Sequence, residues 1–198
     1  MDYFSRAQEQ RDLRIKEIRL FLNNIIPQLK ASNQQFSLEI GCGHGHWLTS
    51  LAEKEPFQYF IGIDLITKRI QKAVTKSQKR NLLNISFLKA DAIEFISAIN
   101  DDMKLRNIYI MFPDPWPKAR HHKRRLVKSE FLKLLIPKTL PHTKLYFRTD
   151  HLNYFEESKN LICESAEWIH SNDHWPDAST SFFQQLLPNY YSLTAKRG

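Results

Sequence analysis

An apolar run, an acidic proline-rich turn and a basic run follow one another in IYIMFPDPWPKARHHKRRLV, residues 108–127. The apolar residues Ile108 to Phe112 are typical of a buried strand, and the three prolines that follow cannot continue a ladder or a helix. We therefore expect Asp114 on a stiff turn at the end of a strand. An acid there can accept hydrogen bonds from a substrate and oppose positive charge that develops in a reaction. An acid that only caps the turn would occupy the same place.

The residues after this turn form a basic segment, Lys118–Lys128, with six Lys or Arg, two His and no acid. Charge at this density attracts a phosphate backbone, and the formal net charge of +8 points the same way. The cations expected to contact phosphate are Lys118, Arg120, Lys123, Arg124, Arg125 and Lys128. A charge run can also be a solvated face, and two of the six could instead pair with nearby acids. Trp116 could stack on a base or pack the turn.

Glycines at alternate positions follow a first strand in Glu39-Ile40-Gly41-Cys42-Gly43-His44-Gly45, and a helical segment comes next. Glycine lets the backbone turn sharply and approach a ligand where a Cβ would collide. Asp64, nineteen residues after Gly45, ends the second strand, where a carboxylate can reach the paired hydroxyls of a ribose. A cofactor site is therefore predicted at Gly41, Gly43, Gly45 and Asp64. A tight turn before a solvated helix would use the same glycines.

Glu39 separates two classes of cofactor. A dinucleotide site favours G-x-G-x-x-G, whereas this loop reads G-x-G-x-G with a carboxylate two residues before it. That carboxylate would repel a pyrophosphate but suits a cation. S-adenosylmethionine has a sulfonium and an ammonium group and no phosphate, so Glu39 favours it over NAD. Asp91, after the third strand, is placed to accept from the adenine amino group and could equally cap the helix 92–99.

Short β-rich runs alternate with helical periodicity along most of the chain. The expected strands are Phe36–Ile40, Tyr59–Ile63, Ile85–Leu88, Ile108–Phe112 and Leu145–Phe147. This alternation predicts an α/β fold with a parallel sheet covered on both faces. An amphipathic helix over 12–29 is expected to cover the sheet, and its arginines could contact RNA. After a helix over 152–165, strands over 167–172 and 190–195 fit an antiparallel pair at a sheet edge.

The length of 198 residues suits a single domain, with residues 1–31 as a helical extension and 32–198 as the core. No apolar run approaches the roughly 20 residues of a membrane span, and the first residues lack the apolar core of a signal peptide. We therefore expect a soluble cytoplasmic protein. Cys42 and Cys163 lie far apart without a partner at metal-ligand spacing, which predicts neither a disulfide nor a metal site.

Together, LEIGCGHG, IGID, KADA and FPDPWPKARHHKRRL resemble the tRNA (guanine-N7-)-methyltransferases of the class I, Rossmann-like methyltransferase superfamily. The resemblance covers nearly the whole chain, and the last motif is the specific one. It implies a mostly parallel seven-stranded sheet with an antiparallel C-terminal hairpin. It also implies S-adenosylmethionine as methyl donor and a guanosine in the tRNA variable loop as acceptor. tRNA is thus the expected partner, with no membrane and no metal, and both monomer and homodimer remain open.

The resemblance also implies roles for single residues. Those implied to bind cofactor are Glu39, Asp64, Asp91 and Asp114, and Asp114 is also the implied catalytic acid. Lys118 and Asp150 match substrate-binding positions. The family's C-terminal Thr-x-aromatic-Glu-x-basic motif corresponds to residues 180–185, where Thr180 and Phe182 fit but Phe183 replaces the acid and Gln185 the base. This departure puts recognition of the target base, rate or substrate identity in doubt.

Three other functions remain open at this point. A methyltransferase acting on an exocyclic amino group of a nucleic-acid base would also place an Asp or Asn and prolines at the end of the fourth strand. An RNA-binding homologue with weakened or no turnover would explain Phe183 and Gln185. An NAD-dependent dehydrogenase fits least well, because of Glu39 and the short glycine pattern.

Overall fold

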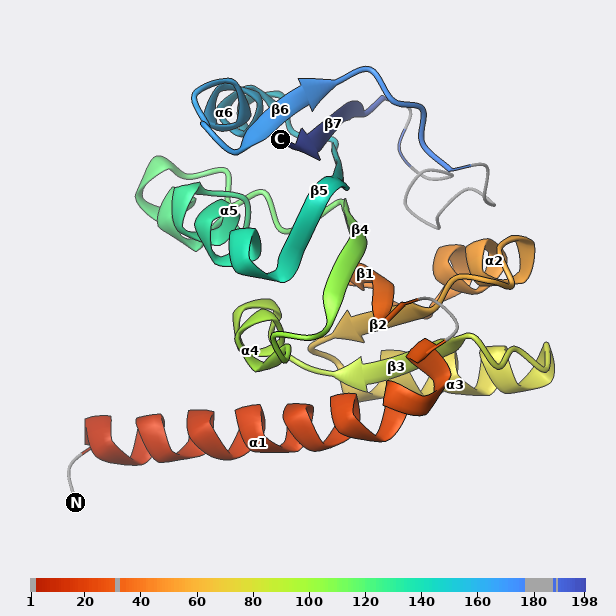
Figure 1. Cartoon of the computed structure of the whole chain (residues 1–198). Coiled ribbons are helices and arrows are strands. Elements are labelled where there is room, and N and C mark those ends of the chain that lie inside the picture. The colour runs from red at the N-terminus through yellow and green to blue at the C-terminus, as the bar shows by residue number, and fades with distance from the viewer. Residues whose placement is uncertain (1–2, 31–32, 177–186, 188) are drawn as a thin grey trace.

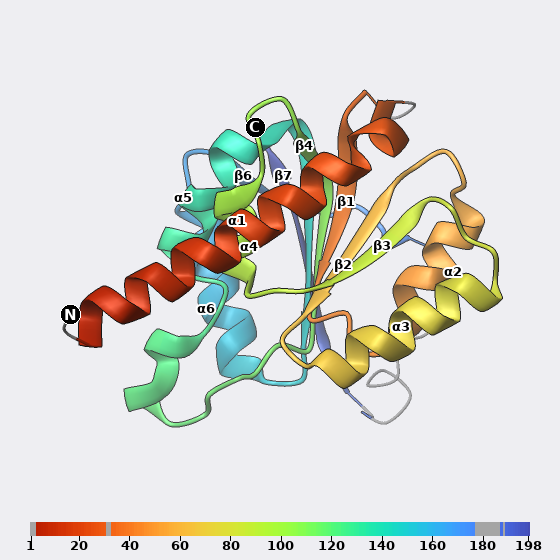
Figure 2. The ribbon, with the colours of Figure 1, turned by 90° about the horizontal axis from the view of Figure 1, so that it is seen from below.

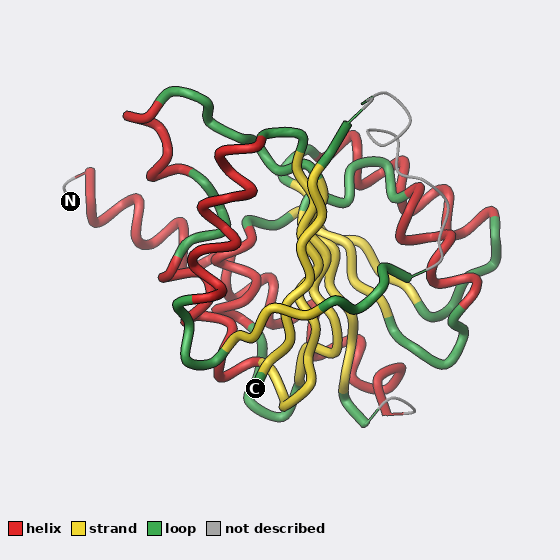
Figure 3. Tube along the Cα trace, turned by 90° about the horizontal axis from the view of Figure 1, so that it is seen from above, coloured by secondary structure: helices red, strands yellow, loops and turns green. Residues whose placement is uncertain are grey.

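Seven strands form one sheet at the centre of the molecule, with helices on both faces (Figures 1 and 3). The computed structural model describes residues 3–30, 33–176, 187 and 189–198. The strands are β1 (Gln35–Ile40), β2 (Phe60–Asp64), β3 (Ile85–Lys89), β4 (Lys104–Met111), β5 (Thr139–Thr149), β6 (Trp168–Ser171) and β7 (Tyr191–Arg197). The α-helices are α1 (Tyr3–Leu29), α2 (His46–Lys54), α3 (Thr67–Lys79), α4 (Ala92–Ala98), α5 (Ser129–Leu135) and α6 (Leu152–Cys163). The 3₁₀ helices are η2 (Ala119–Arg124) and η3 (Ile136–Lys138).

The strand order is β3-β2-β1-β4-β5-β7-β6. Strands β1 to β5 pair in parallel, and β7 pairs antiparallel with both β5 and β6. This order confirms the predicted fold class, including the antiparallel C-terminal hairpin. Because the first five strands are parallel, the chain leaves all of them at the same edge of the sheet.

Two of the predicted strands are longer than the sequence indicated by more than one residue. Strand β4 begins at Lys104 rather than Ile108, and β5 runs over Thr139–Thr149 rather than Leu145–Phe147. The added residues include exposed polar positions, so the apolar pattern could not mark them. Phe112, expected as the last strand residue, lies outside β4 with a φ of 51°.

Each face of the sheet has its own set of helices (Figure 2). Helices α2 and α3 lie on one face, over a cluster that includes Trp47, Phe87 and Tyr109. Helices α1, α4, α5 and α6 lie on the other, over a larger apolar cluster. Strands β1 and β2 are buried almost throughout, and in β1 this burial includes the polar side chains of Ser37 and Glu39.

Helix α1 begins at Tyr3, so the predicted start at residue 12 was wrong. The covering role holds for its second half, where Ile18, Leu22 and Ile25 are buried. Residues 5–14 are exposed and have no apolar stripe, which is why periodicity could not find them. Arg14, at the end of this exposed part, donates two hydrogen bonds to Glu94 of α4, with lengths of 2.8 and 2.6 Å. These bonds attach the exposed part of α1 to α4. In the part of the chain that is described, no helix has both the length and the apolar character to cross a membrane.

Three glycines with positive φ form the turn between β1 and α2, and they differ in what surrounds them. Gly41 and Gly43 have φ values of 77° and 55°, and a Cβ added at either would meet nothing within 4 Å. Gly45 has a φ of 67°, and a Cβ there would lie 2.8 Å from both the Ala73 side chain and the Phe87 ring. Gly45 therefore serves close packing of the turn onto α3 and β3.

This difference predicts unequal costs for Gly43→Ala and Gly45→Ala. Both variants place an L-residue at left-handed φ, which costs about 1–2 kcal/mol. Gly45→Ala adds a steric conflict of about 1–3 kcal/mol, because Ala73 and Phe87 belong to a packed core. Urea unfolding should therefore show a clearly larger loss of unfolding free energy for Gly45→Ala. Equal losses would show that Gly45 is required only for its backbone conformation.

Candidate active site

Five of the predicted acids lie where parallel strands end. Glu39 is the second-last residue of β1, beside Gly62 of β2 and Tyr109 of β4. Asp64 is the last residue of β2, and Asp91 comes two residues after β3. Asp114 and Asp150 follow β4 and β5, whose ends are neighbours through the pair Met111 and Arg148. The fold thus brings acids from five separate stretches of sequence to one edge.

Glu39 carries a buried carboxyl group. Its exposed fraction is 3%, and its Oε2 atom has no hydrogen-bond partner among the described residues. Burial, with a smaller contribution from the charge of Asp64, raises the pKa of Glu39 to about 8. The carboxyl group is therefore mostly neutral at pH 7, and it retains the capacity to bind a donor or a cation.

Asp64 holds the glycine turn in place. It is 5% exposed and accepts hydrogen bonds from the backbone N–H of Gly43 (3.1 Å) and of Ile66 (2.8 Å). Arg69 completes the set, with its guanidinium 3.5 Å from the Asp64 carboxylate. The turn is also tied to β2, because the N–H groups of Gly41 and Cys42 both donate to the Ile63 carbonyl. Asp64 and the glycines predicted with it thus form one connected unit.

Asp91 is the N-cap of α4, which is one of the two roles considered for it. Its Oδ1 atom accepts from the N–H of Ile93 (2.8 Å) and of Glu94 (3.1 Å). Both bonds end on the same oxygen, so Oδ2 lies outside the cap. The capping role therefore leaves Oδ2 of Asp91 able to accept a hydrogen bond from a ligand.

We call residues 112–117 the Asp114 loop. Asp114 is exposed, and among the described residues its carboxylate has no hydrogen bond or ion pair. Phe112 and Trp116 have φ values of 51° and 46°, a conformation that costs bulky residues about 1–2 kcal/mol each. Such strain persists only where the surroundings impose it. Trp116 packs against the basic segment, with the Arg124 guanidinium 4.9 Å from its ring centroid and the His121 ring at 5.9 Å.

The basic segment is partly the 3₁₀ helix η2, and its cations are not equivalent. Lys118, Arg120, Lys123 and Arg124 are exposed, as a phosphate-binding surface requires. Arg125 is 3% exposed and is paired with Glu157 of α6. The structure therefore corrects the expectation that Arg125 offers a free cation to substrate, in favour of the alternative that some cations pair with nearby acids.

Asp150 is exposed at the end of β5, directly before the N-cap residue of α6, His151. Thr180 and Phe183 lie outside the described residues, as does the rest of 180–185. Trp175 and Tyr190, which lie on either side of that stretch in the sequence, both contact the side chain of Arg148. The Arg148 guanidinium lies 3.7 Å from the Trp175 ring centroid and 5.3 Å from that of Tyr190. Sequence reasoning missed Arg148, although it stands two residues before Asp150.

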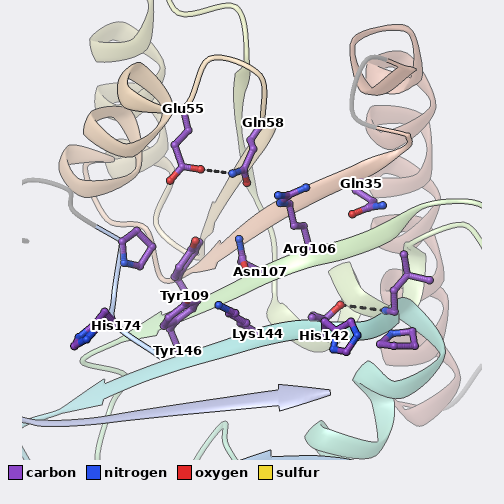
Figure 4. A pocket seen from close by; sticks show the side chains of 14 residues that line it. Gln35, Glu55, Gln58, Arg106, Asn107, Tyr109, His142, Lys144, Tyr146 and His174 are labelled. Atoms are coloured by element: carbon purple, nitrogen blue, oxygen red, sulfur yellow. Dashed lines mark hydrogen bonds between the residues drawn. The ribbon is translucent and has the colours of Figure 1, made fainter. Parts of the chain in front are cut away.

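A separate hollow of about 480 Å³ lies on the sheet face that carries Tyr109 and Tyr146, whose rings stack with centroids 5.0 Å apart (Figure 4). Its other lining residues include Arg106 and Asn107 near the start of β4 and Lys144 at the middle of β5. None of the predicted site residues lines it. In the described part of the chain, no three Cys, His, Asp or Glu side chains are grouped as metal ligands would be.

Comparison with known proteins places the chain in a family. The model of a family described as "Putative methyltransferase" matches residues 33–186. A tRNA (guanine-N(7)-)-methyltransferase from Rubrobacter xylanophilus is 30% identical over 172 residues, which are 87% of this chain and 76% of that protein. A protein of the same name from Clostridium botulinum is 33% identical over 89% of this chain and 82% of its own length.

Solved structures show the same fold. The 16S rRNA methyltransferase KamB superposes with a TM-score of 0.63 at 15% identity, over 87% of this chain and 92% of its own. At this identity the likeness concerns the fold alone. The motifs, the identities and the sheet order agree, and the chain belongs to the tRNA (guanine-N7-)-methyltransferase family.

Proposed function

We propose that this protein transfers the methyl group of S-adenosylmethionine to N7 of a guanosine in the variable loop of tRNA. The observation that carries the proposal is that two carboxyl groups with different environments lie at the carboxyl ends of the adjacent strands β1 and β4. Glu39 at the end of β1 is buried and unpaired, and Asp114 after β4 is exposed on a strained loop. The basic segment follows Asp114 directly. A cofactor side and an RNA side thus meet at one edge of the sheet.

The cofactor side fits a cationic, phosphate-free ligand. The orphan Oε2 of Glu39 can accept from an ammonium group, which would return the carboxyl group to its charged form. Gly41 and Gly43 leave open space where a side chain would stand. Asp64 keeps the turn in shape and would meet the ribose, and Asp91 retains Oδ2 for the adenine amino group. When bound, S-adenosylmethionine supplies an electrophilic methyl group on a sulfonium.

The reaction needs positioning more than proton transfer. Guanine N7 has a free lone pair in the ring plane, so no general base is required. Asp114 would accept from guanine N1–H and the exocyclic amine, which orients the base and opposes the positive charge that grows on the purine. Asp150 follows the carboxyl end of β5, the strand that pairs with β4, and from there it would also contact the substrate.

The RNA side consists of the exposed cations of the basic segment, Lys118, Arg120, Lys123 and Arg124. Contacts from such side chains to phosphates fix the register of an RNA without reading its sequence. They would hold the tRNA while the Asp114 loop receives the base. A cytoplasmic location, where tRNA is available, is part of the same proposal.

The function predicts one product. Unmodified tRNA incubated with the protein and methyl-labelled S-adenosylmethionine should yield N7-methylguanosine, detected by nucleoside analysis and by chemical cleavage at the modified position. A transcript made with 7-deazaguanosine keeps N1–H and the exocyclic amine but lacks N7, and it should accept no label. Label in an N2- or N6-methylated base, or unchanged labelling of the 7-deaza transcript, would replace N7 with an exocyclic amine as the acceptor.

The raised pKa of Glu39 predicts how cofactor affinity depends on pH. The free protein holds the proton up to a pKa of about 8, whereas the complex with a cation favours the carboxylate. Binding therefore releases a proton, and affinity measured by calorimetry should rise between about pH 6 and pH 7.5. Glu39→Gln should bind more weakly and lose this part of the profile, and Glu53→Gln, at an exposed acid of α2, should keep it.

The same shift gives a readout that needs no cofactor. A carboxyl pKa raised from 4.5 to about 8 on folding contributes stability below pH 4.5 that is lost as pH rises through 8. The free energy of unfolding of Glu39→Gln should therefore exceed that of the wild type by an amount that grows from about pH 5 to pH 8. A pH-independent difference would mean that Glu39 is ionised in the free protein.

A further inference from the structure

We propose that Arg125 is a positioning residue that fixes the Asp114 loop against α6 and takes no part in binding the RNA backbone. Its catalytic consequence rests on the proposed function, whereas its structural consequence does not. Arg125 stands inside a basic segment whose other arginines are exposed, so its role is decided by its contacts. These contacts lead to the two loops that carry Asp114 and Asp150.

One contact reaches the Asp114 loop directly. The Nε atom of Arg125 donates to the carbonyl oxygen of Pro115 at 2.9 Å, and Pro115 is the residue after Asp114. The N–H of Phe112 donates to the Arg148 carbonyl at 2.8 Å, but Pro113, Pro115 and Pro117 have no N–H to donate. The strained φ values of Phe112 and Trp116 flank the Pro115 carbonyl. A hydrogen bond from a fixed guanidinium therefore holds the backbone where the loop would otherwise relax.

The other end of the guanidinium is fixed by α6. The Nη1 atom donates to Asn153 Oδ1 at 3.0 Å and forms an ion pair with Glu157. The Tyr154 ring lies beneath it, with its centroid 4.8 Å from the guanidinium carbon. Helix α6 begins immediately after the turn with Asp150, so Arg125 connects the chain after β4 to the chain after β5.

The surrounding residues strengthen this connection. The Tyr154 hydroxyl accepts from the N–H of Val127 at 2.9 Å, which ties the end of the basic segment to the same helix. His122 lies 3.1 Å from Glu157, so one carboxylate meets two residues of the segment. The planar guanidinium of Arg125 donates to Pro115 and to α6 at the same time. The single ammonium group of a lysine could not reproduce this geometry.

The same features argue against a phosphate contact. Arg125 is almost fully buried, and Glu157 opposes its charge within the protein. Arg124, the adjacent residue, is exposed and stacks on Trp116 from the outside. The two arginines therefore offer a matched pair, in which one variant tests positioning and the other tests RNA binding.

The test compares Arg125→Gln, Arg125→Lys and Glu157→Gln with Arg124→Gln, and uses Glu156→Gln, an exposed neighbour on α6, as the control. We expect Arg125→Gln and Arg125→Lys to lower kcat about 10-fold or more at saturating tRNA, because the acid is misplaced. Their tRNA affinity and its salt dependence should stay as in the wild type. Arg124→Gln should instead reduce the slope of log affinity against log salt by about 1.

A cycle with Asp114→Asn separates positioning from general damage. If Arg125 acts through Asp114, Arg125→Gln should cost little further kcat in the Asp114→Asn background. A full additional loss there, or a reduced salt slope for Arg125→Gln, would overturn the inference. Should Arg125→Gln fail to fold, Glu157→Gln, which keeps the arginine but frees its outer end, is judged by the same criteria.

Hydrogen exchange of the free protein gives a readout that does not depend on activity. The amides of Phe112 and Val127, which donate to the Arg148 carbonyl and to the Tyr154 hydroxyl, should exchange faster in Arg125→Gln than in the wild type or Glu156→Gln. Unchanged exchange would overturn the inference even if methyl transfer is lost. Faster exchange in a protein that does not methylate tRNA would contradict the proposed function and leave the role of Arg125 intact.

Discussion

Parallel pairing of β1 with its two neighbours is the constraint on which the site depends. Strand β1 lies between β2 and β4, and all three run in the same direction. Their carboxyl ends therefore meet at one edge, and side chains near those ends are buried by the strands on either side. The carboxyl group of Glu39 is therefore buried. This burial, with a smaller contribution from the charge of Asp64, raises the pKa of Glu39. The turn that Asp64 braces and the loop that presents Asp114 extend from the same edge.

Burial decides what each charge can do. Glu39 is buried without a partner among the described residues, so it is suited to receive a cation from outside. Arg125 is buried with a carboxylate that opposes its charge, so it has structural consequences and little external field. Asp114 is exposed without a partner and is available to a substrate. Three ionisable side chains at one end of the sheet thus have three different capacities, which their residue types alone do not distinguish.

The sequence predicted those parts of the structure that depend on local pattern. Apolar runs located β1 to β5, and the alternation with helices implied that Glu39, Asp64 and Asp114 would share an edge. The burial of Arg125 was not predictable in this way, because its partners on α6 lie 28 and 32 residues further along the chain. The packing role of Gly45 depends on Phe87 of β3, and the position of Arg148 depends on Trp175 and Tyr190. Each of these contacts is made by tertiary structure, so no spacing rule could reveal it.

The central claim is that Asp114 receives the target base, and its turnover tests that claim most directly. The measurement is the kcat of Asp114→Asn for methyl transfer at saturating tRNA and S-adenosylmethionine, beside Glu130→Gln as an exposed acid outside the site. Loss of an acceptor that opposes charge in the transition state is expected to lower kcat about 100-fold, with both binding affinities largely retained. A kcat equal to that of the wild type would contradict the account.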